Sequence, residues 1–159
     1  MVTGSAPIAA DVLDFLKICF SSPICEGYGM TETCAGSVLC YLDDPQTGIV
    51  GGPLQNCKLK LRDIPEMGYY SQGTPEDPTP KGEIMFWGPS IMKGYFKNPE
   101  KTSEAFLNGW LLSGDVGSVM PNGAFKIIDR AKNIFKLAHG EYIAPEKIEN
   151  IFIKSSWVA

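Results

Sequence analysis

The stretch that decides the fold of this chain is Glu26-Gly-Tyr-Gly-Met-Thr-Glu32, near its N-terminal end. The glycines on both sides of Tyr28 let the backbone approach a flat ring closely, and the phenol can stack on that ring. Thr31 offers a hydroxyl for a phosphate group, and Glu32 offers a carboxylate for Mg²⁺. A glycine-rich turn that carries a surface tyrosine explains the stretch equally well, so the stretch alone leaves both interpretations open.

Two further stretches complement the first, Ser113-Gly-Asp-Val-Gly117 and Asp129-Arg-Ala-Lys-Asn-Ile-Phe-Lys136. A carboxylate such as that of Asp115 can accept hydrogen bonds from two neighbouring ribose hydroxyls. Arg130 is a permanent cation with a planar fork of donors, which suits a phosphate. Each has a simpler alternative, since an aspartate can cap a local turn and a D-R-x-K run can be a solvated basic turn. The order of the three stretches therefore carries more weight than any one of them.

In this order the three stretches resemble the adenylate-forming enzymes, the superfamily of acyl-CoA synthetases, luciferases and peptide-synthetase adenylation domains. The tail Lys136-Leu-Ala-His-Gly-Glu-Tyr-Ile-Ala-Pro-Glu-Lys-Ile-Glu-Asn150 is similar to the long-chain fatty acyl-CoA synthetase branch in particular. The resemblance implies a long-chain fatty acid–CoA ligase, which converts ATP, a fatty acid and CoA into acyl-CoA, AMP and pyrophosphate. The expected cofactors and partners are accordingly ATP or AMP, Mg²⁺, a long-chain fatty acid and coenzyme A.

The resemblance also implies roles for individual residues. Thr31 would contact the α-phosphate, Glu32 would hold Mg²⁺, and Lys132 would be the pivot about which a C-terminal domain rotates between two poses. Tyr28 would stack on adenine, and Asp115 would accept from the ribose hydroxyls. The residues assigned in this way to nucleotide or CoA binding are Gly4, Ser5, Gly27, Tyr28, Gly29, Thr31, Asp115, Arg130, Lys136 and Gly140.

Some of these assignments have plain alternatives. The segment Thr3-Gly-Ser-Ala-Pro7 resembles the family's strand end beside the adenine and acyl pocket, but a small-residue turn before a helix explains it nearly as well. Gly140 resembles the turn that lines the family's pantetheine tunnel, and Lys136 would reach phosphate or CoA in the second pose. We interpret His139 as a loop residue and leave it outside the catalytic set, because no nucleophile motif matches it.

The expected fold class is mixed α/β, in the arrangement of an adenylate-forming enzyme. Local patterns alone support only a mixture of helices and strands, and the family supplies the architecture. It divides the chain into the end of an N-terminal α/β layer (1–47), a small β-barrel-like subdomain (48–128), a hinge (129–136) and the start of a mobile α+β C-terminal domain (137–159).

Three helices are predicted from apolar periodicity and capping residues. The first covers residues 8–20 after Pro7, the second starts at Asn98 and ends near Gly109, and the last begins at Pro145. The predicted apolar faces are Ile8, Val12, Phe15, Leu16 and Cys19 in the first helix, and Ile148, Ile151 and Phe152 in the last.

Strands are predicted from alternation and turn residues. Apolar and basic residues alternate over 57–62, and residues 82–87 also form a strand-like run. An Asn-Gly pair between residues 116–120 and 124–128 is a strong hairpin signal. Three prolines and two glycines make residues 66–81 a long loop.

Composition excludes several kinds of partner. A net charge of −4 argues against nucleic acid, which needs a basic surface. The five cysteines form no C-x-x-C pair and there is one histidine, so we expect reduced, mostly buried thiols and no zinc site.

No apolar run reaches the length that crosses a bilayer, and no signal peptide is present. We expect a cytoplasmic protein, or one at the cytosolic face of the endoplasmic reticulum or another organelle membrane, with any membrane association made outside this segment.

Two parts of such an enzyme do not occur within residues 1–159. One is the loop read as T-S-G-T-T-G-x-P-K-G, which grips the β- and γ-phosphates, and the other is a lysine deep in the C-terminal domain. We therefore expect an internal slice of a full enzyme that is inactive in isolation. The alternative is a non-catalytic nucleotide-binding remnant or regulatory fragment. A third hypothesis, an unrelated β-rich interaction module, requires every motif match to be a coincidence.

Overall fold

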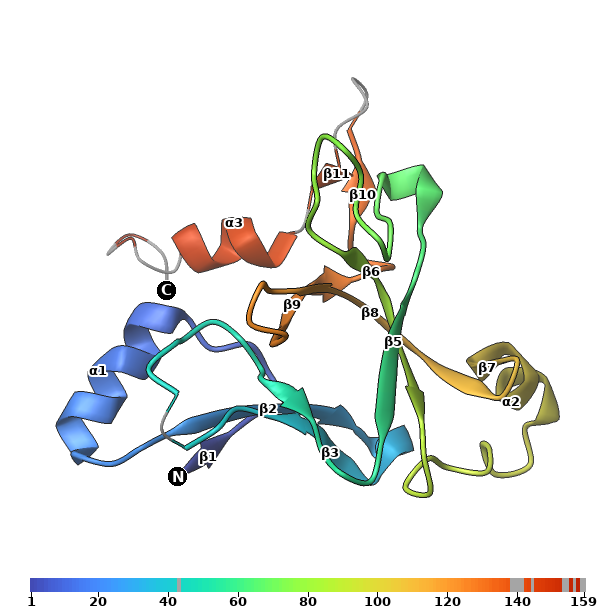
Figure 1. Ribbon diagram of the computed structural model, residues 1–159, viewed down its shortest axis with the longest axis horizontal. Coiled ribbons are helices and arrows are strands. Elements are labelled where there is room, and N and C mark those ends of the chain that lie inside the picture. The colour runs from blue at the N-terminus through green and yellow to red at the C-terminus, as the bar shows by residue number, and fades with distance from the viewer. Residues whose placement is uncertain (43, 138–141, 144, 153–154, 156, 158–159) are drawn as a thin grey trace.

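The computed structural model describes residues 1–42, 44–137, 142–143, 145–152, 155 and 157. These residues form a four-stranded sheet, a five-stranded sheet and a two-stranded ribbon, connected by helices and turns. Figure 1 shows the first sheet along the bottom of the molecule, with the strands of the second sheet rising from it. The predicted mixture of helices and strands is confirmed.

The first sheet opens with a βαβ unit. Strand β1 (Val2–Thr3) runs parallel to β2 (Cys25–Met30), and helix α1 (Ala10–Phe20) connects them. Parallel neighbours need a crossover connection, and the helix predicted in this region supplies it. The deciding stretch of the sequence is therefore the second strand of this unit and the turn that follows it.

Strands β3 (Ala35–Leu39) and β4 (Gly52–Pro53) complete the sheet in the order β1-β2-β3-β4. The chain enters β3 through the 3₁₀ turn η1 (Thr31–Thr33). Strand β3 is antiparallel to β2, and the register shifts at an irregularity between Tyr28 and Gly29. A register shift of this kind re-aims the side chains beside it.

The second sheet is antiparallel, in the order β5-β6-β8-β7 with β9 also paired to β8. The two predicted strands and the predicted hairpin of this region are confirmed as β5, β6 and the pair β8–β9. The predicted long loop lies between β5 and β6, where the chain forms the 3₁₀ turn η2 (Pro65–Met67) and an isolated bridge between Ile64 and Tyr69. The strands are β5 (Lys58–Arg62), β6 (Lys81–Trp87), β7 (Phe106–Leu107), β8 (Trp110–Val119) and β9 (Phe125–Arg130).

Backbone hydrogen bonds and a shared core join the two sheets. The Val50 N–H donates to the Phe125 carbonyl at 2.8 Å, and the Phe125 N–H donates to the Gly51 carbonyl at 2.7 Å. The largest core cluster takes side chains from both sheets and from the segment before β4: Val38, Val50, Ile84, Phe86, Leu111 and Phe125. Because Tyr28 packs against this cluster, the core also positions one wall of the site described below.

The C-terminal part contributes a short ribbon and a helix. Strand β10 (Phe135–Lys136) pairs antiparallel with β11 (Tyr142–Ile143), and helix α3 (Pro145–Phe152) follows (Figure 1). The predicted start of the last helix is confirmed. Its predicted apolar face is not buried, since Ile148, Ile151 and Phe152 are all exposed.

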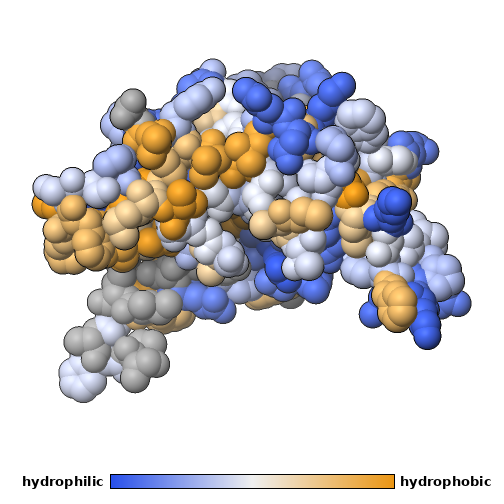
Figure 2. Space-filling model, turned by 90° about the horizontal axis from the view of Figure 1, so that it is seen from below, coloured by the Kyte–Doolittle hydropathy of each residue, from blue (hydrophilic) through white to orange (hydrophobic). Residues whose placement is uncertain are grey.

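The predicted inner face of the first helix is wrong. Leu13 is the buried residue of α1, whereas Val12 and Phe15 of the predicted face are 46% and 64% exposed. Periodicity shows that a helix has an apolar side, but here Leu13 is the one fully buried residue of α1, and most of its other apolar residues are exposed. Figure 2 shows apolar side chains gathered at the end of the molecule where α1 lies.

The second helix is shorter than predicted. The Asn98 side chain accepts from the Lys101 N–H at 3.0 Å, so the predicted cap is confirmed, but α2 (Pro99–Ala105) ends four residues before the predicted Gly109. The reason is a second hairpin, in which Asn108 and Gly109 have φ of +50° and +79°. Two positive φ angles in a row are typical of the type I′ turn that joins β7 to β8.

Two predictions from composition can be compared with the described residues. All five cysteines are free thiols, and Cys25, Cys40 and Cys57 are buried. Among the described residues there is no helix long and apolar enough to cross a membrane.

Candidate functional site

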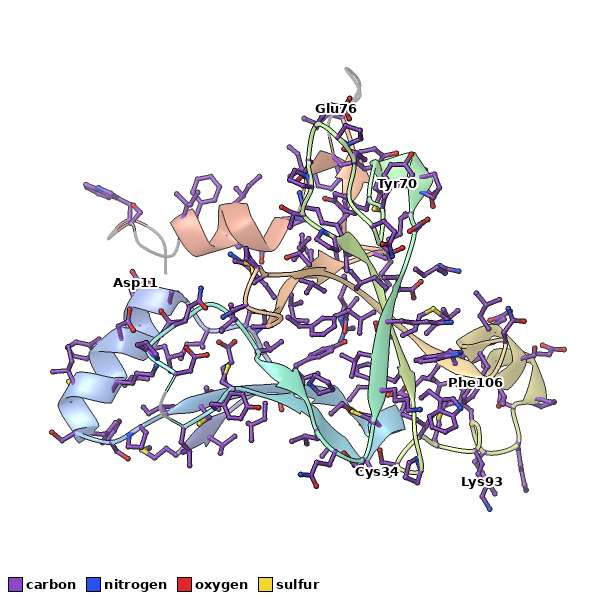
Figure 3. The ribbon with its side chains drawn as sticks, viewed as in Figure 1. Asp11, Cys34, Tyr70, Glu76, Lys93 and Phe106 are labelled. Atoms are coloured by element: carbon purple, nitrogen blue, oxygen red, sulfur yellow. The ribbon has the colours of Figure 1, made fainter. Side chains whose placement is uncertain are left out.

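One cavity collects side chains from all three stretches selected in the sequence. Its volume is about 1150 Å³, and β2, the η1 turn, β8 and the end of β9 contribute to its lining. Cys34, labelled in Figure 3, also lines it, in the turn between β2 and β3. The predicted site residues found in its lining are Gly4, Ser5, Gly27, Tyr28, Gly29, Thr31, Glu32, Asp115, Arg130 and Lys132.

Tyr28 and Asp115 are hydrogen-bonded to each other at this cavity. The Tyr28 hydroxyl donates to Asp115 Oδ2 at 2.6 Å, although the two residues are 87 positions apart. Burial raises the pKa of the Tyr28 phenol well above its usual range, and the Asp115 carboxylate raises it further. The phenol is therefore protonated near neutral pH and acts as a donor. Its ring packs on Phe86, with the ring centroids 5.8 Å apart.

Arg130 lies beside the other carboxylate oxygen of Asp115. The two residues are cross-strand partners on β8 and β9, and Arg130 Nε is 3.5 Å from Asp115 Oδ1. The Asp115 side chain is 12% exposed, whereas that of Arg130 is 60% exposed. The fold therefore holds the carboxylate in place, and the guanidinium can turn toward an anionic ligand. Each carboxylate oxygen has two lone pairs, so Asp115 keeps acceptor capacity for further hydroxyl groups.

A tight corner fixes the backbone around Asp115. Ser113 Oγ accepts from the Asp115 N–H at 3.0 Å, and Gly114 has a φ of +73°, which favours glycine. The Gly114 N–H donates to the buried carboxylate of Glu83 at 3.0 Å, and its carbonyl accepts from the Ala131 N–H at 2.8 Å. Sequence reasoning missed Glu83, because a single glutamate within a strand pattern carries no local signal.

The two threonines of the η1 turn differ in burial and in role. Thr33 is fully buried, and its hydroxyl accepts from the Met30 N–H at 3.1 Å and donates to the Met30 carbonyl at 3.0 Å. Thr31 is exposed at the cavity. Thr33 therefore builds the turn, and Thr31 presents its hydroxyl where a ligand can reach it.

Glu32 is held by Tyr95, which lies in a distant segment to which the sequence interpretation assigns no chemical role. The Tyr95 hydroxyl donates to Glu32 Oε1 at 2.8 Å, and the Glu32 carbonyl accepts from the Met92 N–H at 2.8 Å. The Glu32 carboxylate raises the pKa of the Tyr95 phenol, so the phenol remains a donor near neutral pH. No local pattern points to this contact, because the two residues are 63 positions apart.

The residues present fit a Mg²⁺ ion that is shared with a phosphate ligand. Within the described residues, no three His, Cys, Asp or Glu side chains are close enough together to hold a metal ion. Mg²⁺ often binds proteins through one or two carboxylates and takes its other ligands from water and substrate phosphates. Glu32, half-buried in the cavity lining beside Thr31, suits that mode.

The neighbouring strand explains the glycine after Tyr28. A Cβ built on Gly29 would lie 1.7 Å from the carbonyl oxygen of Ala35 in β3. The sequence interpretation required glycine for the close approach of a flat ring, but β3 alone already excludes any side chain at this position. Gly29 is therefore weaker evidence for a ligand than the Tyr28–Asp115 pair.

A second cavity of about 320 Å³ adjoins the first and shares Tyr28, Asp115 and Arg130 with it. Two buried carboxylates, Glu26 and Asp129, line it, and each has one oxygen without a hydrogen-bond partner among the described residues. Buried acceptors normally have a donor. A bound molecule with N–H or O–H groups could supply one here.

The remaining predicted residues lie toward the C-terminus. Lys132 is exposed in the turn after β9 and lines the large cavity. Lys136 lies in β10, and only its backbone is described. Gly140 and His139 lie outside the described residues.

Comparisons with known proteins agree with this arrangement. Residues 1–96 match the family described as AMP-binding enzyme. The chain is 51% identical to long chain acyl-CoA synthetase 7, peroxisomal, of Arabidopsis thaliana, over 100% of this chain and 22% of that protein. It is 49% identical to long-chain-fatty-acid–CoA ligase 1 of Homo sapiens, over 100% of this chain and 22% of that protein. The structure of o-succinylbenzoate coenzyme A synthetase from Bacillus subtilis, in complex with ATP and magnesium ion, matches with a TM-score of 0.80 at 29% identity, over 96% of this chain and 30% of that chain.

The chain belongs to the AMP-binding enzyme family, and its fold is that of the adenylate-forming enzymes. The curated relatives at 49–51% identity are long-chain acyl-CoA synthetases, so the branch indicated by the tail of the sequence is confirmed. The chain spans 22% of the length of these two relatives.

Proposed function

We propose that this chain forms the nucleotide-binding part of a ligase that joins a long-chain fatty acid to CoA at the expense of ATP. The observation that carries the proposal is the contact of Tyr28, Asp115 and Arg130 at one cavity. These three side chains come from three separate stretches, and they match the three chemical parts of a nucleoside phosphate. Family membership and the names of the relatives supply the reaction class.

In the proposed complex the base, the sugar and the phosphate each meet one of these groups. The Tyr28 ring stacks on adenine, the ribose hydroxyls donate to Asp115, and Arg130 turns from Asp115 toward the phosphate. Thr31 donates to the α-phosphate from the η1 turn. Glu32 would hold Mg²⁺ together with phosphate oxygens, and the ion would neutralise charge on the triphosphate when bound.

The proposed reaction has two steps. A carboxylate oxygen of the fatty acid attacks the α-phosphorus of ATP, which gives acyl-AMP and releases pyrophosphate. The thiolate sulfur of CoA then attacks the acyl carbonyl, the thioester forms and AMP leaves. Lys132, in the turn after β9, is the proposed pivot between the two poses, within a hinge of residues 129–136. The proposed parts before this hinge are the end of the N-terminal α/β layer (1–47) and the β-barrel-like subdomain (48–128), and the start of the C-terminal domain (137–159) follows it. Lys136 and Gly140 are proposed to contact CoA.

Apolar lining residues support a fatty acyl substrate. The lining of the large cavity includes Met30, Val38, Leu39, Leu54 and Leu112 beside the polar residues of the site. Binding there would remove the apolar surface of an alkyl chain from water, and this burial would stabilise the complex by about 0.8 kcal/mol for each CH₂ group. The peroxisomal name of the Arabidopsis relative supports action at an organelle.

Calorimetric titration of the 159-residue chain tests the nucleotide assignment. We expect AMP to bind more tightly than 2′,3′-dideoxy-AMP, and Asp115→Asn to remove that preference. We expect Arg130→Gln to weaken AMP binding and leave adenosine binding unchanged. A palmitoyl-sulfamoyl adenosine, which mimics the acyl-adenylate, should bind more tightly than its acetyl counterpart. Failure of the unmodified chain to bind AMP, or equal affinity for the two nucleotides, contradicts the proposal.

A further inference from the structure

The backbone that carries Asp115 forms a bulge in β8 where this strand pairs with β6. In the pairing of β6 with β8, Glu83 lies opposite Val116 and Met85 lies opposite Leu112. Three residues of β8, numbers 113–115, therefore face the single residue Ile84 on β6. A bulge of this kind leaves backbone groups without their ladder partners, so the N–H groups of the bulge need other acceptors.

The Glu83 side chain supplies one of those acceptors. Its Oε1 accepts from the Gly114 N–H at 3.0 Å, and its Oε2 pairs with Arg62 Nη2 at 2.5 Å. The Glu83 side chain is 5% exposed and that of Arg62 is 45% exposed. A buried carboxylate is retained only when its charge and lone pairs are matched, and Glu83 satisfies this with one partner on each oxygen.

The hydrogen bond between Glu83 and Gly114 acts on the residue next to Asp115, the proposed acceptor for the ribose hydroxyls. Gly114 directly precedes Asp115 and holds a left-handed φ of +73°, so its orientation sets where the Asp115 side chain points. The opposite side of the corner is fixed by the Ala131 N–H on the Gly114 carbonyl. The Gly114 N–H and carbonyl are thus both hydrogen-bonded, and the acceptor for the N–H is the charged carboxylate of Glu83 on β6.

We propose that Glu83 is a positioning residue for nucleotide selection: it holds the Gly114 corner so that the Asp115 carboxylate meets both ribose hydroxyls. This inference rests on the proposed function, because it takes Asp115 as the ribose acceptor. Arg62 neutralises Glu83 from outside and does not reach the ligand. Glu83 makes no contact with the nucleotide and acts only through the backbone of its neighbour.

The test compares AMP with 2′,3′-dideoxy-AMP in calorimetric titrations of the full chain. Glu83→Met removes the acceptor and keeps a side chain of similar length, so we expect AMP affinity to fall about tenfold, to the level of the dideoxy nucleotide. The affinity for 2′,3′-dideoxy-AMP itself should not change, because it makes no use of Asp115. Glu83→Gln retains an oxygen for the Gly114 N–H, and we expect it to keep most of the preference for AMP.

A matched control separates positioning from stability. Met85→Ala removes a buried side chain from the same strand and lowers stability, but Met85 has no polar group to hold the corner. We expect it to leave the ratio of the two affinities unchanged. If Glu83→Met does not fold, Glu83→Asp serves in its place, since it keeps the charge for Arg62 but is shorter by one methylene, and we expect it to reduce the ratio.

The outcomes are distinguishable. A normal ratio in Glu83→Met or Glu83→Asp, or an equal loss of affinity for both nucleotides, overturns the positioning role while the proposed function stands. If the unmodified chain shows no preference for AMP, the proposed function is overturned and the role of Glu83 with it.

Discussion

The Tyr28 hydroxyl donates a 2.6 Å hydrogen bond to Asp115 Oδ2, and this bond ties the first sheet to the second at the centre of the candidate site. Hydrogen bonds to ionised groups are shorter and stronger than those between neutral groups. The contact therefore orients both partners, fixing the plane of the Tyr28 ring on Phe86 and the direction of the Asp115 carboxylate. A nucleotide would meet a base platform and a sugar acceptor that are already aligned with each other.

Tyr28→Phe and Tyr28→Ala separate the two roles of this residue. The phenylalanine variant loses the bond to Asp115 but keeps the ring, so we expect AMP affinity to fall by about 1 kcal/mol. The alanine variant also loses the stacking surface, which adds about 1–3 kcal/mol. Titration calorimetry with AMP measures both. Equal affinities in the two variants would show that the ring does not contact the base.

Tyr95→Phe tests the support of the proposed Mg²⁺ ligand. The variant removes the hydroxyl that donates to Glu32 Oε1 and leaves the ring in place. Groups that orient a metal ligand contribute to metal affinity, so we expect about threefold weaker binding of Mg²⁺–ATP, as for the loss of one hydrogen bond. AMP binding without Mg²⁺ is the control and should not change. A parallel loss with AMP would place the effect in the loop rather than at the ion.

Elements with strong local signals could be predicted from the sequence. The Asn98 cap depends on residues within one turn of each other, and the β8–β9 hairpin depends on an Asn-Gly pair, so each was predictable from a short stretch. The hairpin at Asn108 and Gly109 has the same Asn-Gly signal, but the capping pattern predicts the end of a helix there. The buried side of α1 could not be predicted, because periodicity does not say which of the apolar residues of a helix will be covered by the rest of the protein.

In the candidate site, too, some residues could be predicted from the sequence and others could not. Residue types within three stretches indicated a nucleotide, and the fold brings Tyr28, Asp115 and Arg130 together. The roles of Glu83 and Tyr95 could not be predicted, since each acts over a long separation in the sequence and no local pattern assigns either of them a contact. Tertiary structure alone brings them to the side chains or backbone that they hold.

Glu26→Gln should change how stability depends on pH. Burial raises the pKa of Glu26 from its ordinary value of 4.5, and a smaller effect of a hydrogen bond from the Ile8 backbone opposes it. A carboxyl group with a higher pKa in the folded state binds its proton more tightly when folded, so its contribution to stability is lost as pH rises above about 4.5. We expect the variant to be more stable than the unmodified chain at neutral pH.

That gain should shrink as the pH is lowered below 4.5, where the glutamate becomes protonated in both states. Urea unfolding of both chains at several pH values gives the comparison. Glu66→Gln, on the exposed η2 turn, is the control, and we expect it to alter stability little at any of these pH values. A gain at neutral pH that persists in acid would mean that the amide makes a new contact, not that a buried charge has been removed.

Gly109 and Gly52 form a matched pair for testing the β7–β8 turn. A Cβ built on either glycine meets no atom within 4 Å, but Gly109 has a φ of +79° whereas the φ of Gly52 lies outside the left-handed region. Because an L side chain is strained at positive φ, we expect Gly109→Ala to lower the free energy of unfolding by about 1 kcal/mol or more. We expect Gly52→Ala to change it by less than about 0.5 kcal/mol. Urea denaturation measures both values, and equal effects would show that the turn does not hold Gly109 in the left-handed conformation in solution.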